Sequence, residues 1–254
     1  MRTGTRTGTR TGTRTGTRMT DASAADRRVA DAVRAAAEAG EGLRIVGAGT
    51  WLDAGHPVSA TRTLSLADDR GVVAYSPGDL TITVRAGTTL AEIAEALREH
   101  GQWLALDPEG GMDVTIGATV ATGSYGPAAT LYGTVRDQLL GMTVVTGRGD
   151  IARPGGRVVK NVAGFDLTRL MTGAWGTLGV ITEVTLRVRS SGLANGSIAH
   201  LARIMPARSG YREPVMLHER LATSLKRTFD PARVLNPGIM GETVQDAMRV
   251  SGTA

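Results

Sequence analysis

Two glycine-rich loops in this sequence could hold a phosphorylated ligand through their backbone N–H groups. The first consists of Gly47, Ala48, Gly49 and Thr50, which follow a mainly apolar run at residues 43–46. Glycine lets the main chain approach an anion closely, so this is the general form of a phosphate-binding turn. It is not a Rossmann fingerprint, because Leu52 occupies the third glycine position, and no P-loop Gly-Lys-Ser/Thr is present. A Gly-x-Gly turn is also common between two strands, so this loop alone leaves both interpretations open.

The second loop, residues 117–123, has a small side chain at nearly every position. Such a segment lets amide N–H groups approach a pyrophosphate, and we expect the Thr119 and Thr122 hydroxyls to add hydrogen-bond donors. A small-residue helix packed tightly against a sheet is the alternative interpretation. Together with the further glycines between residues 115 and 188, the two loops favour a protein that binds a large flat cofactor.

Composition excludes several other kinds of site. The sequence contains no cysteine, so it predicts no disulfide, zinc ribbon, iron–sulfur cluster or cysteinyl flavin link within the chain. His200 and His218 have no second ligand at metal-binding spacing, and we predict no metal site. His56 could anchor a flavin covalently, but its Gly-His-Pro context favours an exposed turn.

The formal charge of +5 comes from the amino-terminal repeat. Residues 1–18 contain five arginines and no acid, so subtracting five from +5 leaves the rest of the chain neutral. This basic arm could bind nucleic acid, but the favoured alternative is a start codon upstream of a native start at Met19, so we predict no nucleic-acid partner. The sequence shows no secretory signal and no membrane span, which favours a cytoplasmic protein.

Hydrophobic periodicity predicts the elements that must position the two loops. Helices are expected at residues 21–39, 90–100, 166–171 and 214–229, with a short one after Thr115. Thr89 and Glu92 form a capping box, and Gly40 and Gly101 follow the first two helices as stop signals. Strands are expected at residues 43–46, 61–66, 71–75, 79–85, 102–106, 139–146, 151–153 and 180–188. Because several strands follow one another directly, an α+β fold is favoured over a doubly wound sheet.

Several motifs in this chain resemble the FAD-binding domain of the vanillyl-alcohol-oxidase/PCMH flavoprotein superfamily, most closely the FAD-binding subunits of bacterial glycolate oxidases. They lie at residues 44–50, 86–90, 115–123, 136–141, 155–167 and 176–183. The resemblance implies two α+β subdomains with FAD bound non-covalently between them. It assigns cofactor contacts to Gly47, Ala48, Gly49, Thr50, Gly117, Ala118, Thr119, Thr122, Gly123, Gly133, Arg136, Asp137, Gly179, Val180, Ile181 and Asn236.

The resemblance also implies a reaction and partners. The reaction is oxidation of a small 2-hydroxy acid to a 2-oxo acid, with electrons passed to a partner subunit. The implied partners are a second flavoprotein and an iron–sulfur subunit, through which the protein could associate with a membrane. The residues do not identify a catalytic base.

The chain departs from the family pattern in two places. Ala48 stands where members commonly carry glycine, and a linker of residues 191–213 stands where a substrate-binding cap domain normally lies. The expected organisation is a repeat at 1–18, an FAD-binding domain at 19–190, this linker, a carboxy-terminal helix and turn at 214–242, and a tail at 243–254. The shortened region motivates an alternative function: a non-catalytic FAD-binding or assembly module, or a truncated flavoprotein without a substrate site of its own.

Overall fold

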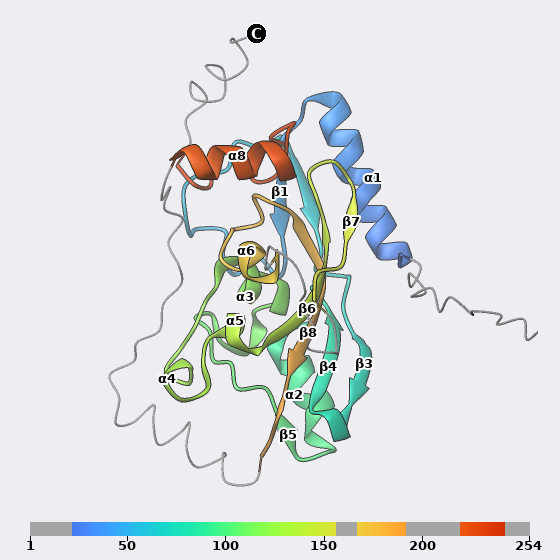
Figure 1. The fold of residues 1–254 in the computed structure, drawn as a ribbon, viewed down its shortest axis with the longest axis vertical. Coiled ribbons are helices and arrows are strands. Elements are labelled where there is room, and N and C mark those ends of the chain that lie inside the picture. The colour runs from blue at the N-terminus through green and yellow to red at the C-terminus, as the bar shows by residue number, and fades with distance from the viewer. Residues whose placement is uncertain (1–21, 156–166, 192–218, 242–254) are drawn as a thin grey trace, which may run out of the picture.

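The fold is taken from a computed structural model, which describes residues 22–155, 167–191 and 219–241 (Figure 1). The expected amino-terminal repeat, the tail and nearly all of the linker lie outside these ranges. Most of the motif at residues 155–167, His200 and His218 also lie outside them.

A sheet of five strands, in the order β3-β4-β8-β6-β7, forms the larger part of the fold. Its strands are β3 (Val72–Ser76), β4 (Thr81–Arg85), β6 (Leu139–Val145), β7 (Ile151–Ala152) and β8 (Val180–Arg187), and all neighbouring pairs are antiparallel. Helices cover both faces, with α1 on one side of β6 and β8 and α3, α5 and α6 on the other (Figure 1). All five residues of β4 are buried although polar and apolar side chains alternate along it, and most of β8 is buried as well. Both faces of these strands are therefore covered.

A second, smaller sheet pairs β1 (Leu43–Val46) with β2 (Arg62–Ser65) in parallel. The carboxy-terminal segment lies along the other edge of β1, where Leu43 forms a bridge with Leu235. A third pair joins β5 (Gln102–Trp103) to β9 (Arg189–Ser190) in antiparallel orientation. These separate sheets with interspersed helices confirm the predicted α+β class.

The helices begin and end where local capping chemistry places them. They are α1 (Ala24–Ala39), α2 (Leu90–Arg98), α3 (Ile116–Thr122), α4 (Ala129–Tyr132), α5 (Val135–Gln138), α6 (Leu167–Met171) and α8 (Glu219–Phe229), with 3-10 turns at Pro77–Asp79 and Gly111–Asp113. The predicted capping box of Thr89 and Glu92 is present, and Gly40 ends α1 in the left-handed conformation. None of the helices within the described ranges is both long enough and apolar enough to cross a lipid bilayer.

Three local predictions differ from the structure. The first helix begins at Ala24 rather than at residue 21, and it is capped by Ser23 in a capping box with Asp26. The strand expected at residues 102–106 contains only Gln102 and Trp103, and α4 and α5 were not expected. Each of these two helices spans four residues, too short to give a recognisable hydrophobic period.

A buried ion network fastens α1 to the large sheet. The Arg85 guanidinium donates to Asp69 at 2.8 and 2.7 Å and to Asp26 at 3.0 Å, and the Asp26 carboxylate also accepts from Thr182. Burial alone would raise the pKa of Asp26, but the hydrogen bonds from Thr182 and Arg85 and the charge of Arg85 together lower it. The network therefore holds Asp26 ionised inside the fold.

Candidate functional site

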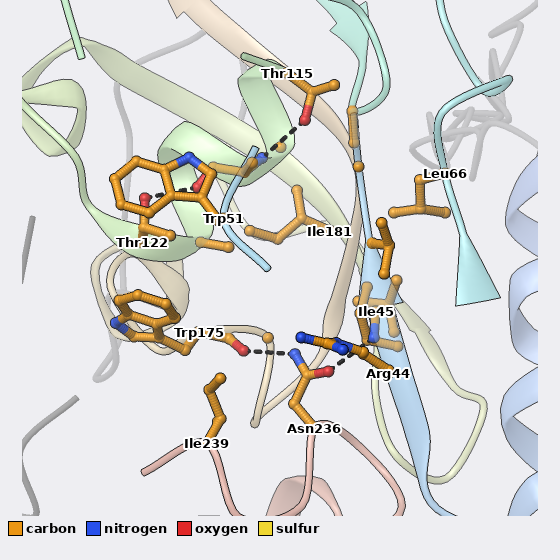
Figure 2. Close-up of a pocket in the computed structure, with 18 of the residues that line it drawn as sticks. Arg44, Ile45, Trp51, Leu66, Thr115, Thr122, Trp175, Ile181, Asn236 and Ile239 are labelled. Atoms are coloured by element: carbon orange, nitrogen blue, oxygen red, sulfur yellow. Dashed lines mark hydrogen bonds between the residues drawn. The ribbon is translucent and has the colours of Figure 1, made fainter. Parts of the chain in front are cut away.

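A pocket lies between the small sheet and the face of the large sheet that carries α3 (Figure 2). Its walls come from β1 and the turn after it, from α3, from the segment entering β8 and from the carboxy-terminal turn. The space between these walls is about 840 Å³, part of it open to solvent. The lining residues are Arg44, Ile45, Val46, Gly47, Gly49, Thr50, Trp51, Leu52, Val58, Leu66, Ala86, Thr115, Gly117, Ala118, Ala121, Thr122, Trp175, Gly176, Gly179, Val180, Ile181, Asn236 and Ile239.

The turn after β1 presents backbone donors that the protein itself does not use. Within the described part of the chain, the N–H groups of Gly47, Ala48, Gly49 and Thr50 have no hydrogen-bond partner. Gly49 has φ +82°, and successive N–H groups around such a left-handed residue form a concave site for anions. Gly47 and Gly49 are half-buried and Ala48 and Thr50 are exposed, so these unused donors are available to an external acceptor such as a bound anion.

The two glycine loops meet at this pocket, as the phosphate-site hypothesis requires. A Cβ atom added at Gly47 would lie less than 3.0 Å from the Thr115 Oγ1 atom, closer than Cβ contacts in real proteins. Thr115 is the N-cap of α3, and its hydroxyl accepts from the Ala118 N–H at 3.3 Å. The absence of a side chain at Gly47 therefore lets the turn after β1 lie directly against the start of α3.

The donors of α3 itself are largely committed to the protein, which corrects one expectation. The Gly117 N–H donates to Ala86 O at 2.9 Å. The Thr119 hydroxyl donates to Thr115 O at 3.1 Å and the Thr122 hydroxyl donates to Ala118 O at 2.8 Å, each one turn back along the helix. The small residues of α3 thus allow close packing against Ala86, as the alternative interpretation held, while Gly117, Ala118 and Thr122 still line the pocket.

Asn236 fastens two walls of the pocket together (Figure 2). Its side-chain oxygen accepts from Ile45 N at 2.7 Å, and its amide nitrogen donates to Trp175 O at 2.7 Å. Ile45 and Gly47 lie on the same edge of β1, because successive residues of a strand point their N–H groups to opposite sides. Asn236 therefore binds the N–H group two residues before Gly47, where the free amides of the turn begin.

Lys226 and Asp230 hold the segment that carries Asn236. The Lys226 ammonium donates to Thr177 O at 2.8 Å and Leu235 O at 2.9 Å, and it pairs with Asp230 Oδ2 at 2.8 Å. The Asp230 carboxylate is fully buried and accepts from Val234 N and Leu235 N. This cluster joins α8 to the carbonyl of Thr177, in the segment that leads into β8.

The remaining walls are mainly apolar, and two of them are aromatic. Trp51 and Trp175 meet edge to face with ring centroids 6.2 Å apart, and both line the pocket together with Ile181 and Ile239. Trp175 is buried as well as lining the pocket. Apolar and aromatic walls beside a polar turn suit a ligand with a flat ring system at one end and an anion at the other.

Six of the expected contact residues do not line the pocket: Ala48, Thr119, Gly123, Gly133, Arg136 and Asp137. Gly123 ends α3 with φ +66°. Asp137 caps α5 by accepting from Thr134 N, and Gly133 (φ +80°) packs against it. Arg136 donates to Thr172 O at 3.1 Å. These local contacts account for Gly123, Gly133, Arg136 and Asp137 without a ligand.

Other lining residues were given no role from the sequence. Thr115 was expected only as a helix cap, and Arg44 only as part of a motif. Val58 and Ile239 have no chemical signature in the sequence, because a lone apolar residue outside a periodic run looks the same in a core and in a pocket wall. His56 is exposed and absent from the lining. Across the described ranges, no three His, Asp or Glu side chains gather as a metal-binding group would.

The family of FAD-binding domains matches residues 23–155, slightly more than half of the chain. The chain is 45% identical to glycolate oxidase subunit GlcE of Escherichia coli over 147 residues, which are 58% of this chain and 42% of that subunit. It is 43% identical to the mitochondrial D-lactate dehydrogenase [cytochrome] of Arabidopsis thaliana over 44% of this chain and 19% of that enzyme. It is 39% identical to glycolate oxidase subunit GlcD of Bacillus subtilis over 43% of this chain and 23% of that subunit.

Among solved structures, an alkyldihydroxyacetonephosphate synthase superposes with a TM-score of 0.55 and 24% identity, covering 64% of this chain and 30% of that one. This likeness shows a shared fold. The chain therefore spans less than half the length of each of these curated relatives and of this structural neighbour.

Proposed function

We propose, from the premise that this chain belongs to the family of FAD-binding domains, that it is the FAD-binding subunit of an oxidoreductase and that the pocket holds the cofactor. The observation that carries this proposal is the row of four backbone donors at Gly47–Thr50, which lack partners in the described part of the chain. A diphosphate supplies the acceptors that these donors need.

The pocket walls fit the other parts of the cofactor. Trp51, Trp175 and Ile181 would offer apolar contacts to the ring of FAD, and Gly179 and Val180 also line the pocket. Binding is non-covalent, because the chain has no cysteine and His56 lies outside the lining. When bound, FAD supplies hydride and electron transfer, and the protein supplies binding and orientation.

The proposed reaction is oxidation of a small 2-hydroxy acid to a 2-oxo acid. Two relatives are named glycolate oxidase subunits and another a D-lactate dehydrogenase, and both names specify 2-hydroxy acid substrates. We further propose that its partners are a second flavoprotein and an iron–sulfur subunit. Any association of this protein with a membrane would occur through these partner subunits. Since this chain has no cysteine, an iron–sulfur relay would be carried by a partner.

The direct test is the visible absorption spectrum of the purified protein after incubation with FAD. We expect the absorption bands of oxidised flavin to remain after gel filtration, and acid to release all of the flavin. Tryptophan emission should fall on binding, because two of the three tryptophans line the pocket. A protein that stays colourless and does not quench with excess FAD would remove the proposal.

A second candidate is a non-catalytic FAD-binding or assembly module. It is motivated by the linker at residues 191–213, which stands where members of the family normally carry a substrate-binding cap domain. The two candidates separate in the complex with the partner subunits. Glycolate-dependent dye reduction that is lost when the Gly47–Thr50 turn is altered supports the oxidoreductase. Turnover that is unchanged when this chain cannot hold FAD supports the module.

A further inference from the structure

Arg44 is the only charged side chain among the described residues that line the pocket. It lies on β1, three residues before the turn of free amides begins at Gly47. The other lining groups are apolar side chains, hydroxyls, one carboxamide and main chain. A ligand that carries a diphosphate brings full negative charge into this pocket, and neutral N–H dipoles alone offset only part of the cost of desolvating that charge.

The guanidinium of Arg44 is held beside the turn. Its Nη2 atom donates to Leu52 O at 2.8 Å, so the side chain reaches across from the strand before the turn to the main chain after it. No other hydrogen bond joins this guanidinium to the described residues, although an arginine side chain has five N–H donors. Figure 2 shows Arg44 beside Ile45 and Asn236, at the wall that leads into the turn.

We propose that Arg44 pairs with the diphosphate of the bound dinucleotide and makes the pocket select for that charge. The assignment rests on the proposed function and names one of its determinants. The free amides of residues 47–50 would orient the diphosphate, and the guanidinium would supply the compensating charge from the side of Leu52. A planar guanidinium with several free donors suits two phosphate oxygens at once, which an ammonium does not match as well.

The test compares FAD dissociation constants of the full-length wild type, Arg44→Met and Arg44→Lys, measured by tryptophan quenching and by calorimetry. Arg62→Met is the matched control: it removes the same charge from β2, the strand paired with β1, at a guanidinium that pairs with the exposed Glu41 outside the pocket. Each protein is titrated at about 50 mM and about 500 mM NaCl, because salt screens an ion pair more than a neutral hydrogen bond.

At the lower salt concentration we expect Arg44→Met to weaken FAD binding by about tenfold to a hundredfold, the range for a charge-assisted hydrogen bond. The defect should shrink at the higher salt concentration, because wild-type binding weakens with salt more steeply. Arg44→Lys should recover part of the affinity, and Arg62→Met should stay within about twofold of wild type. Thermal unfolding of the apoproteins should differ little, since only one exposed hydrogen bond is lost.

Three results would overturn the assignment while leaving FAD binding itself intact. The first is equal affinity of Arg44→Met and wild type at both salt concentrations. The second is a loss of affinity that does not change with salt, which would reduce Arg44 to bracing the loop through Leu52. The third is unchanged affinity for oxidised FAD with weaker affinity for reduced FAD, which would place the guanidinium against the ring. Failure of the wild type to bind FAD would instead remove the proposed function.

Discussion

Replacing Gly47 by alanine should separate the two loops that meet at the pocket. The added Cβ would lie well under 3.0 Å from Thr115 Oγ1, whereas ordinary contacts begin near 3.4 Å, so the Thr115 side chain or one of the two segments must move by about 1 Å. Overpacking of this kind costs about 1–3 kcal/mol. Displacing the Thr115 hydroxyl also weakens the cap of α3, which is worth about 1 kcal/mol. We therefore expect a loss of about 2–4 kcal/mol in unfolding free energy, or about 4–16 °C in melting temperature.

The matched control is Gly78→Ala. Gly78 has no atom within 4 Å of an added Cβ and no positive φ, so this change should be nearly neutral. Thermal unfolding of the apoprotein measures stability, and an FAD titration measures how far the turn has moved. In a double-mutant cycle, Thr115→Ala should reduce the cost of Gly47→Ala by about 1 kcal/mol or more, because the clash involves the Thr115 side chain.

A Gly47→Ala protein that matches Gly78→Ala in both melting temperature and FAD affinity would refute the contact between the two loops. A clash that persists unchanged with Thr115→Ala would place it elsewhere. Loss of FAD affinity without loss of stability would show instead that the added methyl group meets the cofactor.

Three further predictions concern the Lys226–Asp230 ion pair, the buried Asp26 network and the way in which FAD is attached. Lys226→Met should lower the unfolding free energy, measured by urea titration, by about 3 kcal/mol, because it leaves the buried Asp230 carboxylate without its cation. An unchanged unfolding free energy would show that the backbone N–H donors alone stabilise the Asp230 carboxylate. The pKa of Asp26 is lowered in the folded state, so its contribution to stability is full above the unfolded pKa and is lost as pH falls through the folded pKa. The urea midpoint of the wild type should therefore decrease as the pH is lowered below about 4. Asp26→Asn should have a lower urea midpoint than the wild type at neutral pH and a smaller decrease in acid. His56→Ala should keep acid-releasable FAD at wild-type stoichiometry; flavin that resists acid in the wild type but not in the variant would contradict the non-covalent assignment.

Elements with strong local signals were predictable from the sequence. The capping box at Thr89, the left-handed stop at Gly40 and the short helix capped by Thr115 each depend on neighbouring residues only, and the structure contains all three. The four-residue helices α4 and α5 were missed, because one helical turn gives no period to recognise.

The site was predictable in part, because its determinants are split between local and distant contacts. The sequence identified the free-amide turn after β1 from its glycines, and the structure places it against α3. It could not show that the Thr119 and Thr122 hydroxyls are committed to helix carbonyls, since that depends on helix geometry rather than residue type. Nor could it show that Trp51 and Trp175, far apart in the chain, meet at one wall.

The bond between Ile45 and Asn236 spans 191 positions of the chain, so the pocket cannot be completed before residue 236 has been synthesised. A ribosome-bound chain that has emerged only through β8 has both glycine loops but lacks the residue that holds β1 to the segment carrying Trp175. Such long-range closure is slow compared with the formation of local hairpins and helices. Cofactor capture should therefore wait until Asn236 has left the ribosome and can bind to Ile45 and Trp175.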